Sequence, residues 1–258
     1  MVFARKRFGQ HFLHDTATQQ RIIDAVAAQP GDALVEIGPG RGALTRGLLS
    51  AAGALDAIEI DRDLAALLQE RFAEEPGFVL HQADALKFDI AALARTRGRR
   101  LRIVGNLPYN VSTPLLFHLL RTPDAISDLH IMLQREVIDR IVAEPDSEHY
   151  GRLGVMLAPW VQATRLFEVG PGAFSPPPQV WSAVARLDVR RAPLFPIDAR
   201  FGRLVAAAFS HRRKTMRNAV KGLVSIADIE AAGIDPGTRP ETLSPQDFGR
   251  LAEAMPSG

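Results

Sequence analysis

The feature that most constrains the fold is an alternation of short apolar runs with longer amphipathic segments through the first half of the chain. Apolar runs occupy residues 33–37, 55–60 and 101–104, and amphipathic segments at residues 44–52 and 64–72 follow the first two. Strands that alternate with helices in this order form βα units around a parallel sheet. The sequence therefore predicts an α/β fold with a mostly parallel sheet.

After Glu144 the pattern changes. Residues 153–170 end in alternating apolar and polar positions, a proline-rich stretch follows at residues 174–180, and residues 181–189 alternate again. Period-two alternation is typical of strands in antiparallel sheets with one buried face. We expect two antiparallel strands, bridged by a loop, that close one edge of the sheet.

The last part of the chain shows only helical periodicity. Because Pro193 and Pro196 precede it, we expect a first domain at residues 1–190, a linker at about residues 191–196 and a small all-helical domain at residues 197–258. Two apolar faces at helical spacing support the helices. The first face is Phe201, Leu204, Val205 and Ala208, and the second is Met216, Ala219, Val220 and Leu223.

Composition excludes several classes of function. The chain has no cysteine, so disulfides, thiolate metal sites and cysteine nucleophiles are excluded, and its 7 histidines show no metal-ligand spacing. No apolar run reaches the ~18 to 20 residues that a membrane span needs, and residues 1–10 lack the apolar stretch of a signal peptide. We therefore expect a cytoplasmic protein with no membrane and no metal requirement.

A glycine-rich stretch, VEIGPGRGAL, lies between the first strand of these units and its helix. Gly38, Gly40 and Gly42 lack a Cβ atom, so the backbone N–H groups there can approach a ligand closely. Gly38, Gly40 and Ala43 also satisfy the dinucleotide pattern G-x-G-x-x-G/A. A nicotinamide-dependent oxidoreductase and an ordinary tight turn both remain open at this point.

Carboxylates follow the next two strands. Glu59 lies about 20 residues beyond the glycines, where an acidic side chain can accept hydrogen bonds from ribose hydroxyls, and Asp61 is its nearby competitor. Asp84 follows the third strand, where a carboxylate can receive an adenine amino group. Ligands in open α/β sheets bind at the carboxyl ends of strands, so we expect these side chains to line one crevice.

The stretch GNLPYN follows the fourth strand and would line the same crevice. It supplies the Asn106 side-chain amide, the Leu107 backbone, the rigid Pro108 and the Tyr109 ring. An amide oxygen, a stiff backbone and an aromatic ring can together bind a flat base through its amino group and its face.

With these motifs the sequence resembles the ribosomal RNA adenine N6-dimethyltransferases, and among them the small-subunit (16S) enzymes. The resemblance covers nearly the whole chain. It rests on FGQHFL at residues 8–13, VEIGPGRGALT, AIEID, Asp84, GNLPYNVSTPLL, FSPPPQVWSAVARL and AFSHRRKTMRNA. Two positions depart from the family, since His11 stands where Asn is usual and Trp181 where an acidic residue is common.

The resemblance implies a Rossmann-like S-adenosylmethionine-dependent methyltransferase domain and a helical RNA-binding domain. It implies dimethylation of N6 of two adjacent adenosines in a hairpin near the 3′ end of 16S rRNA, within the immature small ribosomal subunit. The implied cofactor-binding residues are His11, Leu13, Gly38, Gly40, Glu59, Asp84 and Asn106. The implied catalytic residues are Asn106, Leu107, Pro108, Tyr109 and Phe174.

The four residues from Asn106 to Tyr109, which we call the catalytic box, suggest how the chemistry proceeds. The N6 lone pair of adenine is delocalised into the ring, so the amine is a poor nucleophile. We hypothesise that the Asn106 side-chain oxygen and the Leu107 carbonyl accept its two hydrogens and localise the lone pair. Tyr109 and Phe174 would stack on the two faces of the base.

Basic residues are clustered, although the formal net charge is only +2. The segment from Ser210 to Gly222 carries no acidic residue, and clustered Arg and Lys are typical of a phosphate-backbone binder. We expect this segment to be an amphipathic helix whose basic residues bind RNA. These residues are Arg212, Arg213, Lys214, Arg217 and Lys221.

Alternatives remain at this stage. A large-subunit rRNA adenine methylase and a DNA adenine methyltransferase share the chemistry. A ribosome assembly factor that acts mainly by binding would use the same basic surface. We expect a monomer.

Overall fold

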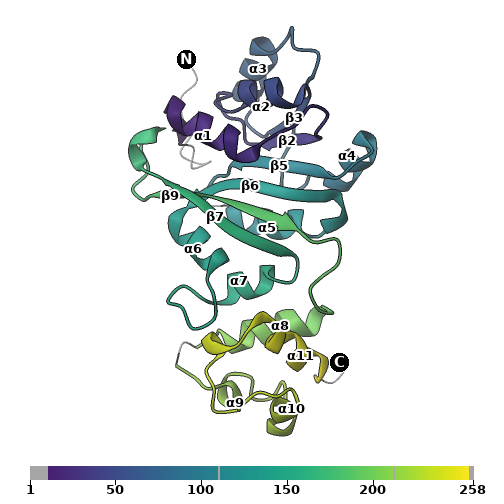
Figure 1. Ribbon diagram of the computed structural model, residues 1–258, viewed down its shortest axis with the longest axis vertical. Coiled ribbons are helices and arrows are strands. Elements are labelled where there is room, and N and C mark those ends of the chain that lie inside the picture. Colours follow the sequence, from purple (N-terminus) through teal and green to yellow (C-terminus); the bar gives the residue numbers. More distant parts are fainter. Residues whose placement is uncertain (1–10, 110, 212, 256–258) are drawn as a thin grey trace. The chain divides into compact units, whose positions relative to one another are not determined.

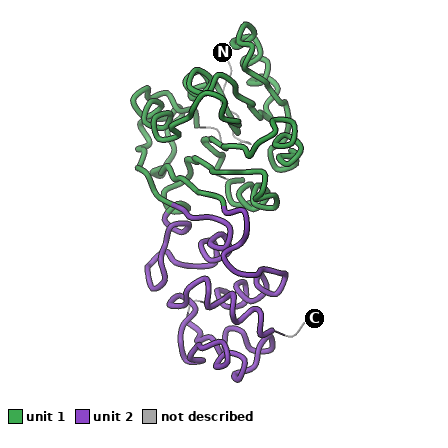
Figure 2. The backbone as a smooth tube through the Cα atoms, turned by 45° about the vertical axis from the view of Figure 1, so that its right-hand side comes forward, with its two compact units in different colours: residues 1–138, 164–189 green, residues 139–163, 190–258 purple. Residues whose placement is uncertain are grey.

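The computed structural model describes residues 11–109, 111–211 and 213–255 (Figure 1). The chain divides into two compact units (Figure 2). The first comprises residues 1–138 and 164–189, and the second comprises residues 139–163 and 190–258.

The first unit is built on a seven-stranded sheet with the order β4-β3-β2-β5-β6-β9-β7. The strands are β2 (Leu34–Ile37), β3 (Leu55–Glu59), β4 (Phe78–Gln82), β5 (Leu101–Asn106), β6 (Ile126–Gln134), β7 (Val161–Val169) and β9 (Ser182–Val189). The pairs from β4 to β6 are parallel, and β9 pairs with β6 antiparallel. This confirms the predicted mostly parallel sheet with late strands at one edge.

Helices follow the strands as the βα pattern predicts. They are α1 (Thr16–Val26), α2 (Thr45–Ala52), α3 (Arg62–Arg71), α4 (Ile90–Arg97), α5 (Ser112–Leu119) and α6 (Arg135–Val142), with a 3-10 turn η2 at Pro123–Ala125. Acidic side chains begin three of them, because Asp15, Asp61 and Asp89 each accept a backbone N–H of the first helical turn. One apolar core joins α1, α2 and α3 to side chains of β2, β3, β5 and β9.

The parallel register brings four strand ends to one edge of the sheet. Ile37 on β2, Glu59 on β3, Gln82 on β4 and Asn106 on β5 each end their strand there. The loops that follow these residues therefore meet, as open α/β sheets require of a ligand site.

A two-stranded sheet contributes to the same side of the unit. Strand β1 (Phe12–Leu13) pairs antiparallel with β8 (Phe174–Ser175), which follows the 3-10 turn η3 (Pro171–Ala173). The pairing places Leu13 opposite Phe174. Sequence periodicity did not predict this contact, because strands of two residues show none.

The second unit is mostly helical. Its elements are α7 (Arg152–Leu157), α8 (Ala199–Ala208), α9 (Met216–Ala219), α10 (Ile226–Ala231), η4 (Pro240–Thr242) and α11 (Pro245–Glu253), and α6 crosses into it from the first unit. The predicted apolar face of α8, from Phe201 to Ala208, is buried. None of the helices in the described part of the chain is long and apolar enough to span a membrane.

Two details differ from expectation. Residues 139–163, which we placed in the first domain, belong to the second unit, where Tyr150 is buried and donates its hydroxyl to the Leu243 carbonyl at 2.7 Å. The expected amphipathic helix around Met216 is only the four residues of α9. Backbone N–H groups of Met216 and Arg217 bond to carbonyls of residues 238 and 236 instead of to a preceding helical turn.

Candidate active site

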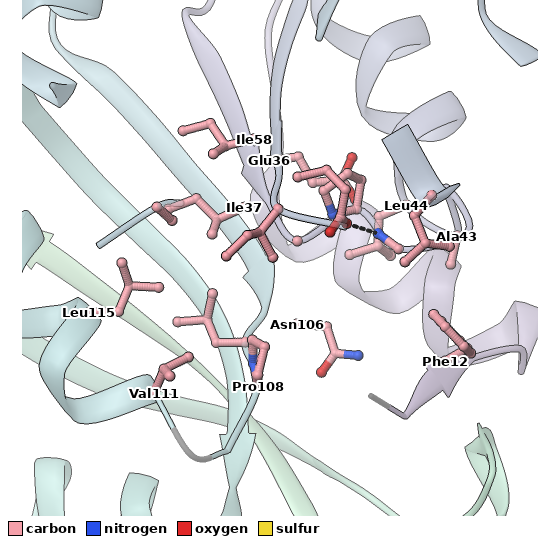
Figure 3. Close-up of a pocket in the computed structure, with 18 of the residues that line it drawn as sticks. Phe12, Glu36, Ile37, Ala43, Leu44, Ile58, Asn106, Pro108, Val111 and Leu115 are labelled. Carbon is pink, nitrogen blue, oxygen red and sulfur yellow. Dashed lines mark hydrogen bonds between the residues drawn. The ribbon is translucent and has the colours of Figure 1, made fainter. Parts of the chain in front are cut away.

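A cavity opens where the carboxyl ends of β2, β3, β4 and β5 meet (Figure 3). Almost every residue predicted for the cofactor or for catalysis lines it. The residues brought together are His11, Leu13, Gly38, Gly40, Glu59, Asp84, Asn106, Leu107, Pro108 and Tyr109.

The glycine-rich loop forms one wall of this cavity. Gly38 and Gly40 have φ angles of 67° and 58°, in the left-handed region that favours glycine. A Cβ atom on Gly40 would lie 3.3 Å from the Phe12 ring, so this glycine also permits a close approach. The glycines therefore let the backbone of the loop come close to the ligand side.

Glu59 is fixed at the end of β3 by backbone donors. Its carboxylate accepts the Gly40 N–H at 3.2 Å and the Asp61 N–H at 2.9 Å. The residue is only 5% exposed, and burial raises the pKa of its carboxyl. Asp61, the competing carboxylate, caps α3, because it accepts the N–H groups of Asp63 and Leu64 and does not line the cavity.

Asp84 lines the cavity from the loop that follows β4, the outermost of the four strands. One of its carboxylate oxygens accepts the Leu86 N–H at 3.0 Å, which fixes the turn after the strand. Ile60 and Leu86 add apolar surface to the lining, and Ile60 is 48% exposed. Apolar walls with a carboxylate between them suit a flat heterocycle that carries an amino group.

Glu36 is a lining residue that was not singled out from the sequence. It lies on β2 (Figure 3), is 2% exposed and accepts the Thr45 hydroxyl at 2.6 Å. Burial raises the pKa of Glu36 to about 7, and the Thr45 hydrogen bond opposes the shift only in part. The signal in the sequence was an acidic residue inside an otherwise apolar strand, where a charge is rarely buried without a partner.

Asn106 is held by its amide nitrogen. Its Nδ2 donates to the His11 carbonyl at 3.2 Å, which fixes where the amide oxygen points. The Leu107 N–H donates to the Met132 carbonyl at 3.2 Å. Among the described residues, no donor reaches the Asn106 amide oxygen or the Leu107 carbonyl. Both residues line the cavity, where these two oxygens have no hydrogen-bond donor among the described residues.

Gly105 permits the close packing beneath this box. A Cβ atom there would lie 2.7 Å from the Ile37 carbonyl oxygen, closer than real Cβ contacts come. The strands β2 and β5 therefore carry their loops to the cavity side by side only because this position has no side chain.

Tyr109 is fixed at its hydroxyl and at its ring. The hydroxyl oxygen lies 2.6 Å from the Ser182 Oγ, and the ring stacks on the His11 imidazole with centroids 5.7 Å apart. Burial raises the pKa of Tyr109, with the Ser182 contact opposing it. The imidazole is in turn bonded through Nδ1 to the Pro176 carbonyl at 2.8 Å.

Phe174 is not brought to the cavity. It is 2% exposed and packs in the apolar core with Leu13 and Val169, because β8 pairs with β1 and directs the ring inward. Its predicted place opposite Tyr109 therefore has no support in this arrangement. Core packing, the ordinary role of a buried aromatic ring, accounts for it.

The predicted RNA-binding residues lie in the second unit. Arg213, Lys214, Arg217 and Lys221 are exposed, and Arg212 lies outside the described residues. No group of three or more His, Asp or Glu side chains that could hold a metal ion occurs in the described ranges.

The chain matches the family model described as ribosomal RNA adenine dimethylase over residues 1–256. The ribosomal RNA small subunit methyltransferase A of Nitrosococcus oceani is 54% identical over 247 residues, which cover 95% of this chain and 93% of the relative. The protein of the same name from Pseudomonas aeruginosa is 52% identical over 254 residues, which cover 98% of this chain and 94% of the relative.

Solved structures share the architecture. The crystal structure of the 23S rRNA methyltransferase ErmE aligns with a TM-score of 0.75 at 27% identity, over 95% of this chain and 99% of that one. A dimethyladenosine transferase from Plasmodium falciparum aligns with a TM-score of 0.81 at 23% identity, over 93% and 96% of the two chains, and shows the likeness of fold.

Proposed function

Because the chain belongs to the ribosomal RNA adenine dimethylase family, we propose that it dimethylates N6 of two adjacent adenosines in a hairpin near the 3′ end of 16S rRNA. The methyl donor is S-adenosylmethionine, and the substrate is the immature small ribosomal subunit. The choice of the small subunit rests on relatives more than 50% identical, which are named small subunit methyltransferases. Membership of this family leaves no place for the nicotinamide-dependent alternative.

One observation carries the proposal. The glycine loop, the two carboxylates Glu59 and Asp84, and the box from Asn106 to Tyr109 all line a single cavity. A nucleoside-shaped ligand and an acceptor base would each find polar groups of the right kind there.

The lining fits S-adenosylmethionine by its donor set. Glu59 presents a fixed carboxylate to ribose hydroxyls, and Asp84 presents one to an adenine amino group. Ile60 and Leu86 supply apolar faces for the ring. Glu36 places a buried acidic group in the same lining, where it favours a cationic ligand. When bound, S-adenosylmethionine supplies a methyl group on a positively charged sulfur.

The catalytic box prepares the acceptor. The amide oxygen of Asn106 and the Leu107 carbonyl, both without a donor among the described residues, accept the two N6 hydrogens of adenine before the first transfer and the one remaining hydrogen before the second. Two such bonds favour a tetrahedral nitrogen whose lone pair is localised and directed. Tyr109, held by Ser182, offers a ring for the base.

No strong base is needed in this scheme. The methylated nitrogen is acidic and releases a proton readily after the transfer, and the acceptor oxygens give it a path toward water. Catalysis therefore comes mainly from orientation and from fixed dipoles.

The exposed basic residues of the second unit would bind RNA phosphates. Arg213, Lys214, Arg217 and Lys221 have no acidic neighbour in the segment from residue 210 to 222. Arginine in particular binds phosphate through two parallel hydrogen bonds. These contacts position the RNA and do not by themselves select a sequence.

The test is transfer of labelled methyl groups from S-adenosylmethionine to small ribosomal subunits that lack the modification, with large subunits, naked rRNA and duplex DNA in parallel. Formation of N6,N6-dimethyladenosine on the immature small subunits supports the proposal. Transfer to large subunits or to DNA alone would reassign the substrate. Cofactor binding without transfer to any of the four would favour a role in assembly by binding.

A further inference from the structure

Trp181 is an exposed aromatic residue beside the active site that the catalytic scheme does not use. It is 48% exposed, and its neighbour Val180 is 44% exposed. A single exposed apolar side chain is ordinary on a protein surface, so exposure alone assigns nothing. The position of the indole and the way it is held are more informative.

The indole is fixed to the end of the sheet. The Trp181 carbonyl accepts the Arg135 N–H at 2.9 Å, which extends the pairing of β9 with β6 by one residue. A Cβ atom placed on Gly170 would lie 3.5 to 3.8 Å from three carbons of the six-membered ring. The ring therefore lies against bare backbone on one side, and about half of the residue's surface faces solvent.

Trp181 directly precedes a residue that supports the catalytic box. Ser182 follows it and holds the Tyr109 hydroxyl at 2.6 Å. Successive side chains in extended chain point to opposite sides, and Trp181 does not line the cavity. The indole is therefore outside the cavity that would hold the target base. It is nevertheless at the same edge of the sheet as Ser182, because the Cα atoms of residues 181 and 182 are only about 3.8 Å apart.

Two arginines lie on the segments that hold the indole: Arg135 donates its N–H to the Trp181 carbonyl, and Arg165 is on β7, the strand that leads to Gly170. Two guanidinium groups approach one carboxylate, because Arg135 lies 3.7 Å and Arg165 lies 3.0 Å from oxygens of Glu168. The side chains of Arg135 and Arg165 are 48% and 41% exposed, so both can also reach a phosphate.

We propose that the indole of Trp181 is a stacking platform for the nucleobase next to the target adenosine. This inference rests on the proposed function, because it assumes that an unpaired RNA strand reaches the cavity. An enzyme that acts on a base must take it out of its stack, which leaves the neighbouring base without a partner on one face. An exposed, fixed indole replaces that partner, and it does so for any base because every base has a π-face.

The first arm of the test separates binding from chemistry. Methyl transfer is measured with increasing rRNA substrate for the wild type, Trp181→Ala, Trp181→Phe and the control Val180→Ala. We expect Trp181→Ala to raise KM about tenfold with kcat within about twofold, as for removal of one stacked base. Trp181→Phe restores most of the affinity, Val180→Ala behaves as the wild type, and binding of S-adenosylmethionine is unchanged in all.

The second arm observes the indole directly. In a Trp160→Phe background Trp181 is the only tryptophan, since the chain has 2. Its fluorescence is followed as an RNA hairpin with two adjacent adenosines is added, with and without an abasic nucleotide on either side of the target. We expect quenching that an abasic neighbour abolishes on one side. We also expect the abasic RNA to bind more weakly to the wild type but not to Trp181→Ala.

Other outcomes overturn the inference. They are an unchanged KM in Trp181→Ala, an equal rise in KM in Val180→Ala, and an abasic effect that is the same with and without the indole. A fall in kcat alone would instead mean that Trp181 acts through Ser182 and Tyr109. Failure of the proposed function is recognised separately, because the wild type would then transfer no methyl group to any rRNA substrate.

Discussion

The side-chain nitrogen of Asn106 donates a hydrogen bond to the backbone carbonyl of His11, 3.2 Å away and 95 positions earlier in the chain. The bond fixes the amide so that its oxygen is the group left for a ligand. The orientation of the principal acceptor in the catalytic box is therefore set by the segment that carries β1.

Replacing Asn106 tests this acceptor. We expect Asn106→Ala to lower kcat by about 10² to 10³, the range found when one preorganised polar group is removed from a reaction centre. Asn106→Asp should also reduce activity, because a carboxylate cannot donate to the His11 carbonyl. Because Asn106 is also an implied cofactor-binding residue, S-adenosylmethionine binding is measured by calorimetry and transfer is compared at saturating cofactor. Near wild-type transfer in Asn106→Ala would refute the proposed role.

Glu59 and Asp61 are a matched pair of buried carboxylates with different tasks. Glu59→Gln should weaken S-adenosylmethionine binding about 10- to 100-fold, since hydrogen bonds to a charged group contribute about 1.5 to 3 kcal/mol. Asp61→Asn should leave this affinity unchanged, because Asn also caps a helix well. The reverse order of effects in a calorimetric titration would assign the ribose contact to Asp61.

The raised pKa of Glu36 predicts that cofactor binding is coupled to the release of a proton. Its pKa is raised to about 7 by burial, so below neutrality the folded protein holds it protonated. A cationic ligand favours the carboxylate, so binding should release a proton and the affinity should rise from about pH 6 to about pH 8. Calorimetry in buffers of different ionisation enthalpy measures the release. Glu36→Gln should remove most of it.

Asp56 links stability to pH. Burial opposes its ionisation, but hydrogen bonds from His81 at 2.7 Å and from Arg97 at 2.7 and 2.6 Å outweigh burial and hold its pKa below the usual value. The stabilisation is present above the unfolded pKa of about 3.9 and disappears as pH falls through the folded pKa. Urea unfolding of the wild type should therefore show a steeper fall in stability below about pH 4 than that of Asp56→Asn.

The same variant has an effect at neutral pH. Removal of one partner from a buried ion pair costs ~3 to 5 kcal/mol, and here the cost should be lower, about 2 to 3 kcal/mol, because the Arg97 side chain is 35% exposed. An unchanged free energy of unfolding in Asp56→Asn at neutral pH would contradict this expectation.

The basic residues of the second unit predict a salt dependence. Joint replacement of Arg213, Lys214, Arg217 and Lys221 by Gln should weaken RNA binding and reduce its dependence on salt. The slope of the logarithm of the binding constant against the logarithm of the salt concentration should become shallower by about 0.7 to 0.9 for each phosphate no longer bound. Arg95→Gln on α4 is a control, because α4 leads into the start of β5, away from the cavity edge. Filter binding at several salt concentrations measures the slopes, and equal slopes would refute the RNA contact.

The sequence was informative wherever local chemistry and periodicity agree. One rule was enough to predict the site: the carboxyl ends of parallel strands meet at one edge of the sheet. With it, the βα order brings together the glycine loop and the residues at the ends of β3, β4 and β5. Contacts between distant segments were not accessible in this way. The pairing of β1 with β8, and the packing of residues 139–163 with the helical unit, depend on which surfaces meet after folding.

Three cases show the limits in physical terms. Phe174 carries no mark in the sequence that separates a stacking ring from a core ring, and the structure buries it. Glu36 lies in an apolar run, and the strand that this run predicts gives no sign that the carboxyl lines a cavity. The spacing of Met216 and Val220 predicted a long helix, whereas their burial is achieved by one turn, α9, and the chain that follows it.

The short pairing of β1 with β8 has a consequence for the timing of assembly. It brings together segments about 160 positions apart, and the His11–Pro176 bond spans 165. Such a contact forms only after a long loop has closed, and two residue pairs return little free energy for that closure. The pairing of β1 with β8 should therefore form last during folding and open first in the native protein. The backbone amides of β1 and β8 should then exchange with deuterium well before those of β5 and β6.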